Sequence, residues 1–168
     1  KAIARTHNIP VHEASIGSGH IIRCRTLARV LKQRGAAITF LCRRQSGDLI
    51  SLLEKEFDIL DLPEHPQVCC DGLKGRDLYR AWLGCTQDQD AEDCLKSLAQ
   101  AGISSASWLV VDHYGLDAAW ESKMLSGLNT ESSTSLFVID DLNLSRVCCF
   151  WTFLIFVVFR SRNLANIS

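Results

Sequence analysis

The sequence lacks a strong excess of charge of either sign. Its 18 lysine and arginine residues nearly balance its 19 aspartate and glutamate residues, which gives a formal net charge of −1 at pH 7. This balance argues against a polybasic surface for nucleic acid and against a highly charged disordered tail. Charge alone identifies no partner, and we expect no nucleic acid among the ligands.

The sequence also lacks a secretory signal and any cysteine spacing typical of a metal site. Its first residues, KAIARTHNIPVHEAS, contain no apolar run of about 7–15 residues, which a signal peptide requires. The eight cysteines form no CxxC pair and no His/Cys cluster at zinc spacing. We therefore expect reduced thiols, a cytoplasmic location, no metal and no cofactor.

What the sequence does contain is an alternation of helical periodicity with short apolar, β-rich runs. We expect helices at 20–34, 46–56, 88–101 and 116–128, and strands at 36–42, 57–63, 107–112 and 136–141. Strands that alternate with helices form a parallel sheet through right-handed crossovers. The pattern predicts an α/β fold with a Rossmann-like doubly wound parallel sheet, and the length of 168 residues suits a single domain.

Polar side chains follow two of the predicted buried strands. Asp112, His113 and Tyr114 come after WLVV, and Asp140 with Asp141 comes after LFVI. Ligands of doubly wound sheets collect beyond the carboxyl ends of the strands, so these residues are candidates for a binding site. Carboxylates that merely cap the next helix would give the same pattern, and this structural alternative stays open.

The stretch IGSGH, residues 16–20, leads into the first predicted helix. Its glycines would permit a tight turn, and the free N–H groups of the helix's first turn would suit a phosphate. The stretch matches neither the GxGxxG fingerprint nor the GxxxxGK[ST] loop. His20 could simply cap the helix; alternatively, the helix dipole would keep its imidazole neutral and able to accept a proton from water.

Several segments, in order, resemble blocks of one known family: IGSGHIIRCRTLA, ITFLCRRQSGDLI, WLGCTQDQDAEDCL, WLVVDHYGLDAAWE and VIDDL. The family is the nucleotide-sugar hydrolases of pseudaminic acid synthesis, which remove UDP from UDP-2,4-diacetamido-2,4,6-trideoxy-β-L-altropyranose. The resemblance spans about residues 14–142. It implies the N-terminal half of a two-domain architecture similar to GT-B glycosyltransferases.

The resemblance also implies roles for individual residues. His20 would be the general base that activates water for attack at the anomeric carbon, with Gly17, Ser18 and Gly19 shaping the loop around it. Arg23 would face the cleft. The substrate would be a UDP-sugar, and Asp112, His113 and Tyr114 would contact the sugar or orient the base. The chemistry requires a positioned base and a stabilised diphosphate, and the sequence demands no metal for it.

Both ends of the chain depart from the family pattern. The first residues include Pro10 and show little strand pattern, so we expect the first strand to be damaged or absent. After VIDDL the family would continue into a second domain, so we assign 1–145 to a Rossmann-like domain and expect the second domain to be missing. Residues 146–168 form an aberrant hydrophobic tail, which we attribute to a shift of reading frame or gene boundary near residue 143.

The apolar run 147–159 in this tail is too short to cross a membrane comfortably. As a helix it would span about 20 Å, against a hydrocarbon core of about 30 Å. We therefore expect no membrane span. A packed strand or helix and a tail anchor stay open as alternatives.

Three functions are compatible with the sequence. The first is a UDP-sugar hydrolase, or its base-bearing half. The second is a truncated, non-catalytic fragment that binds a nucleotide sugar or a partner. The third is a GT-B glycosyltransferase relative that moves the sugar to an acceptor, because fold does not determine function. The sequence does not indicate an oligomeric state.

Overall fold

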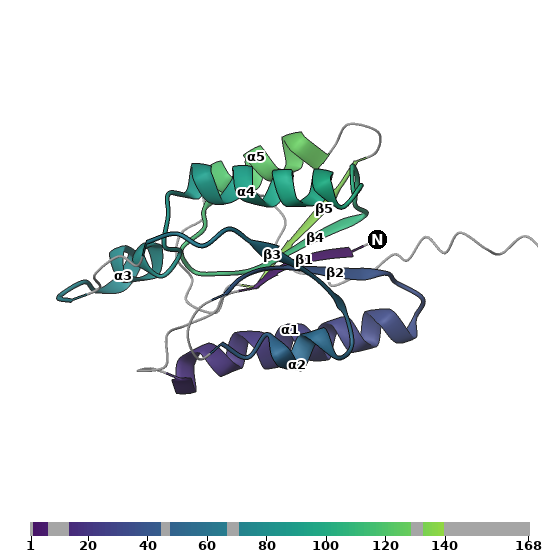
Figure 1. Cartoon of the computed structure of the whole chain (residues 1–168), viewed down its shortest axis with the longest axis horizontal. Helices are drawn as coiled ribbons and strands as arrows, with labels where there is room; N and C mark the ends of the chain where they lie inside the picture. Colours follow the sequence, from purple (N-terminus) through teal and green to yellow (C-terminus); the bar gives the residue numbers. More distant parts are fainter. Residues whose placement is uncertain (1, 7–13, 45–47, 67–70, 129–132, 140–168) are drawn as a thin grey trace, which may run out of the picture.

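The protein is represented by a computed structural model that describes residues 2–6, 14–44, 48–66, 71–128 and 133–139 (Figure 1). Within these residues five parallel strands form one sheet in the order β3-β2-β1-β4-β5. The strands are β1 (Ala2–Thr6), β2 (Ile38–Arg43), β3 (Asp58–Leu62), β4 (Trp108–Asp112) and β5 (Ser135–Val138). The order reverses at β1, so the predicted α/β, Rossmann-like doubly wound fold is confirmed.

Helices cover both faces of the sheet. They are α1 (Ala14–Gln33), α2 (Ser51–Glu54), α3 (Gly75–Ala81), α4 (Gln87–Gln100) and α5 (Ala118–Leu128). Helices α1 and α2 lie on one face, and α4 and α5 lie on the other (Figure 1). The predicted tail at 146–168, together with Asp140 and Asp141, lies outside the described residues.

The expectation of a damaged or absent first strand is wrong. Strand β1 is the central strand of the sheet and pairs with β2 on one side and with β4 on the other. Ala2 and Ala4 are small enough to lie close beneath α1, and Ile3 packs on the opposite face. Hydrogen bonding to two neighbouring strands thus outweighs the weak strand propensity of AIART.

The expected glycine turn is also wrong, because α1 already begins at Ala14 and Gly17–Gly19 lies within it. Glycine in a helix costs about 1 kcal/mol relative to alanine, but burial of the apolar face further along α1 offsets this cost. That face includes the buried residues Ile21, Cys24 and Ala28. Two other elements differ as well: α2 is shorter than the predicted helix at 46–56, and α3 forms in a stretch for which no element was predicted.

A hydrophobic core lies on each face of the sheet. The α4/α5 side contains Ile3, Leu109, Val111, Trp120 and Met124 among others. The α1/α2 side contains Phe40, Ile50, Leu53 and Val110 among others. Successive residues of a strand point to opposite faces, so Asp112 points to the same side of β4 as Val110, toward α1. The alternation of β4 therefore directs this carboxylate to the helix that carries His20.

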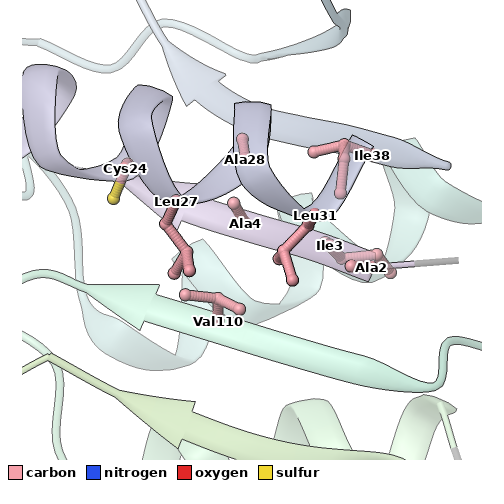
Figure 2. Close-up of a pocket in the computed structure, with 9 residues that line it drawn as sticks. All are labelled: Ala2, Ile3, Ala4, Cys24, Leu27, Ala28, Leu31, Ile38 and Val110. Carbon is pink, nitrogen blue, oxygen red and sulfur yellow. The ribbon is translucent and has the colours of Figure 1, made fainter. Parts of the chain in front are cut away.

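A small apolar hollow lies between α1 and strands β1, β2 and β4 (Figure 2). Its lining consists of Ala2, Ile3, Ala4, Cys24, Leu27, Ala28, Leu31, Ile38 and Val110. These side chains carry no charged or hydroxyl group, so the hollow has no chemistry for a nucleotide sugar. Among the helices that the structure describes, none is both long and apolar enough to cross a bilayer.

Candidate functional site

Four of the predicted site residues meet at the carboxyl end of β4, and we call them the His20 cluster: His20, Arg23, Asp112 and Tyr114. The Nδ1 atom of His20 lies 2.6 Å from Oδ1 of Asp112. Arg23 donates from Nε to Oδ2 of Asp112 at 2.6 Å and from Nη2 to Oδ1 at 2.5 Å. Residues 92 positions apart in the chain therefore form one polar group at the sheet edge where ligands collect.

Tyr114 covers one side of the imidazole. Its ring centroid lies 4.7 Å from that of His20 at an interplanar angle of 70°, an edge-on contact. Nη2 of Arg23 donates to the Tyr114 hydroxyl at 3.2 Å. His20 is 2% exposed and Asp112 is fully buried, and the imidazole lies against the carboxylate of Asp112 and the ring of Tyr114. The site is therefore a packed polar group, and Arg23, with a side chain 32% exposed, connects it to solvent.

The tautomer of His20 follows from its partners. An ionised carboxylate only accepts hydrogen bonds, so Nδ1 carries the hydrogen and donates it to Asp112. Nη2 of Arg23 also lies 2.9 Å from Nδ1, but two donors cannot bond to each other, and Nη2 has Asp112 as its acceptor. In the neutral tautomer that fits this contact, the lone pair lies on Nε2.

Asp112 is ionised in this arrangement. Burial by itself would raise its pKa, but the hydrogen bonds from Arg23 and His20 outweigh burial and hold the pKa of Asp112 below its ordinary value of 3.8. Cys24 adds a weak S–H contact to Oδ2 at 3.4 Å.

The expectation that the helix dipole acts on His20 is wrong. His20 lies about two turns inside α1, whereas the dipole acts mainly within the first turn. For the same reason His20 does not cap the helix, and Gly17, Ser18 and Gly19 form no loop. The structure replaces the dipole with a carboxylate as the group that controls the imidazole.

His113, the neighbour of Asp112 in sequence, makes a hydrogen bond of its own within the chain turn that follows β4. Its Nδ1 atom accepts a hydrogen bond from the backbone N–H of Gly115 at 2.9 Å, and the residue is 1% exposed. Asp112 does not cap the next helix, as the structural alternative would require. That role falls to Asp117, whose Oδ1 accepts from the N–H of Ala119 at 3.0 Å.

Sequence reasoning missed a second buried polar group on the opposite face of the sheet, which we call the Asp90 network: Arg5, Arg43, Asp90 and Asp93. Oδ1 of Asp90 accepts from Arg5 at 2.8 Å and from Arg43 at 2.9 Å. Arg43 also reaches Oδ2 of Asp93 at 3.0 Å. Trp120 donates its indole N–H to Asp90 at 3.0 Å. Two arginines and two carboxylates thus balance their charges within the core.

A signal for this network exists in the sequence. Asp90 lies one helical turn before Cys94 and two turns before Leu98, so it falls on the apolar face of α4. A carboxylate on a core-facing stripe needs a buried cation, and Arg5 and Arg43 lie near the carboxyl ends of β1 and β2. The pairing itself could not be read from spacing, because it joins segments 85 and 47 residues apart.

Within the described residues, one group of side chains could hold a metal ion. It comprises His65, Cys85 and Asp93, whose ligand atoms all lie within 4.8 Å of one another. Cys85 is not disulfide-bonded, and burial raises the pKa of its thiol to about 11. Sequence reasoning did not find this group, because His65 lies 20 residues before Cys85 and no metal-site spacing joins the three residues.

Comparisons with protein-family models, with curated proteins and with solved structures find no match to this chain. The fold therefore rests on the sheet topology described above, and the candidate site rests on its own geometry.

Proposed function

We propose that the chain carries the general base of a hydrolase that releases UDP from a UDP-linked diacetamido-trideoxy sugar. The observation that carries the proposal is the 2.6 Å contact between Nδ1 of His20 and buried Asp112 at the carboxyl edge of β4. A histidine oriented by a carboxylate is the usual form of a general base in hydrolysis. The sequence resemblance supplies the substrate class.

The reaction uses the chain's residues in three roles. Nε2 of His20 takes a proton from water while the water oxygen bonds to the anomeric carbon. The bond from that carbon to the diphosphate oxygen breaks, and UDP leaves with the bonding electrons. Asp112 stabilises the imidazolium that results, and the proton then passes to solvent. A base of this kind accelerates such a step by about 10²–10⁴-fold.

Positive charge near this edge would favour the departing diphosphate. The guanidinium of Arg23 belongs to the His20 cluster and is 32% exposed. The N-terminal end of α1 lies at the same side of the molecule as the carboxyl end of β1 (Figure 1), and helix N-termini favour anions. These two features support a site for the leaving group.

One observation favours the non-catalytic alternative, in which the chain binds a nucleotide sugar without cleaving it. His20 is 2% exposed, so water reaches its ring only if the surrounding side chains move when substrate binds. In this alternative the imidazole would serve to hold α1 against β4. A GT-B glycosyltransferase relative would use the same edge and differ in transferring the sugar to an acceptor.

The test measures UDP release from the UDP-sugar by the full chain, alone and together with a separately produced second domain of a hydrolase of this class. His20→Ala should lower turnover by about 10²–10⁴-fold and leave the far-UV circular dichroism spectrum unchanged. Thr26→Ala is the matched control, because this residue is exposed on the same helix. Turnover that survives His20→Ala would remove His20 from the base role.

Two other results would select the alternatives. Binding of the UDP-sugar without UDP release, in both the isolated and the supplemented chain, would favour the non-catalytic fragment. UDP release that requires an acceptor and yields a glycosylated product would favour the transferase.

A further inference from the structure

The structure places a histidine, a cysteine and a carboxylate together on the α4 side of the sheet, apart from the His20 cluster. His65 follows β3, Cys85 precedes α4 and Asp93 lies in the second turn of α4. Nε2 of His65 lies 2.8 Å from Oδ2 of Asp93, and all three ligand atoms lie within 4.8 Å of one another. We propose that these residues form a binding site for a zinc ion.

The donor set suits zinc better than magnesium or calcium. One imidazole nitrogen, one thiolate sulfur and one carboxylate oxygen make the mixed set that zinc accepts in a tetrahedron, whereas magnesium and calcium prefer oxygen ligands. Zinc bonds of about 2.0–2.3 Å place neighbouring ligand atoms less than about 4 Å apart. The present distances approach this spacing, so small side-chain rotations suffice to close the site.

Hydrogen bonds from neighbouring side chains orient the carboxylate of Asp93. Its Oδ1 accepts from the side-chain amide of Gln89 at 3.1 Å, and its Oδ2 accepts from Arg43 at 3.0 Å. Hydrogen bonds of this type orient the carboxylates that ligate metals. Arg43 also donates to Asp90 at 2.9 Å, and Asp90 accepts from Arg5 as well, so Asp90 and Asp93 together balance the two arginines before an ion arrives.

An ion can reach the site from solvent. Both His65 and Cys85 are partly exposed, and the His65 side chain is 23% exposed. The thiol makes only a weak contact in the described structure, with Sγ 3.8 Å from the carbonyl oxygen of Leu83. The three ligands also belong to separate segments, so a bound ion would tie the loop after β3 to the start of α4.

Binding has a defined proton balance. The ion replaces the hydrogen between Nε2 of His65 and Oδ2 of Asp93, and the imidazole shifts to its Nδ1–H tautomer without net proton loss. Cys85 releases its S–H proton to solvent and binds as thiolate. Each zinc ion taken up therefore releases one proton and changes no oxidation state.

Cobalt(II) is the probe, because it replaces zinc and its bond to a thiolate produces a charge-transfer band in the near ultraviolet. The full chain, freed of metal by a chelator and kept reduced, should bind one cobalt ion with this band, and added zinc should abolish the band. Cys85→Ser should eliminate the band. His65→Gln should weaken cobalt binding by about tenfold or more.

Glu64→Gln is the matched control, because Glu64 is exposed, lies beside His65 and is not one of the three proposed ligands. It should bind cobalt as the unchanged chain does. Far-UV circular dichroism checks that each variant is folded. The proposal is overturned if the unchanged chain shows no band, or if folded Cys85→Ser retains it, since the metal would then use other cysteines.

Discussion

The His20 cluster and the Asp90 network are built from similar residues on opposite faces of the same sheet edge. Each contains a buried carboxylate held by arginine, and each joins a strand to a helix distant in sequence. They differ in composition and in access. The Asp90 network pairs two arginines with two carboxylates inside the core, whereas the His20 cluster contains an imidazole, one carboxylate and an arginine that reaches solvent.

This difference separates a structural group from a candidate for chemistry. A buried carboxylate such as Asp90, whose charge is paired with arginines, has little capacity to exchange protons. An imidazole oriented by a carboxylate can gain and lose a proton near neutral pH. Buried charge alone therefore does not locate a reactive site, and Asp93 of the Asp90 network also contacts an imidazole, that of His65, whose side chain is 23% exposed.

The largest effect on stability should come from Asp90→Asn. The substitution leaves the buried guanidinium groups of Arg5 and Arg43 without this counter-charge, and we expect the free energy of unfolding to fall by about 3–5 kcal/mol. Urea denaturation measures this loss of unfolding free energy. Asp88→Asn, an exposed position on the same helix whose partner is Lys123, is the control and should change stability far less. Equal losses in the two variants would contradict a special role for the network.

Asp112→Asn should have a smaller effect at neutral pH, about 1.5–3 kcal/mol, because one of its partners, Arg23, already reaches solvent. The pKa of Asp112 is lowered in the folded state, so its contribution is complete above the ordinary value of 3.8 and is lost as pH falls through the folded value. The difference in unfolding free energy between the Asp112→Asn variant and the unchanged chain should therefore become smaller in acid. Urea denaturation at a series of pH values measures this difference.

Asp58→Asn, an exposed position on β3, is the control for the acid experiment. In the opposite outcome, the difference in unfolding free energy between Asp112→Asn and the unchanged chain stays constant down to the lowest pH. That result would show that the charge of Asp112 does not stabilise the fold.

The smallest effect should come from Glu56→Gln, which removes a carboxylate that arginines hold at the surface. Glu56 accepts from Arg29 at 2.5 Å and from Arg25 at 2.8 Å, and these hydrogen bonds lower the pKa of Glu56 to about 2. Water and salt screen such pairs. We expect the smallest shift of the urea midpoint in the series, and none in high salt. A salt-independent shift as large as that of Asp90→Asn would contradict the importance of burial.

The sequence predicted the class of fold because each element carries its own local pattern. Strand β4 reads as a continuous apolar run, and α4 and α5 repeat at helical period, so their positions agree with the expected ranges to within two residues. The first strand was not predicted, because AIART has little local strand pattern. Its pairing with β2 and β4 holds it in the sheet.

The candidate site could be predicted only in part for the same reason. Asp112 and Tyr114 were named from their position after a strand and His20 from its position at a predicted helix start, whereas Arg23 was named only from the family resemblance. The structure brings these four residues together. The partner of each side chain was not predictable from spacing. Whether Asp112 would cap a helix or hold an imidazole depends on how α1 crosses the sheet, which is a tertiary property.

The central position of β1 has a consequence for the order in which the molecule assembles. Its ladder with β2 closes over a short stretch of chain, but its ladder with β4 pairs Ala2 with Trp108 and must wait for most of the sequence. Contacts of such long range slow folding. Until β4 joins the sheet, Asp112 has no imidazole to hold. A half-assembled sheet would therefore have an open edge beside β1 and no His20 cluster.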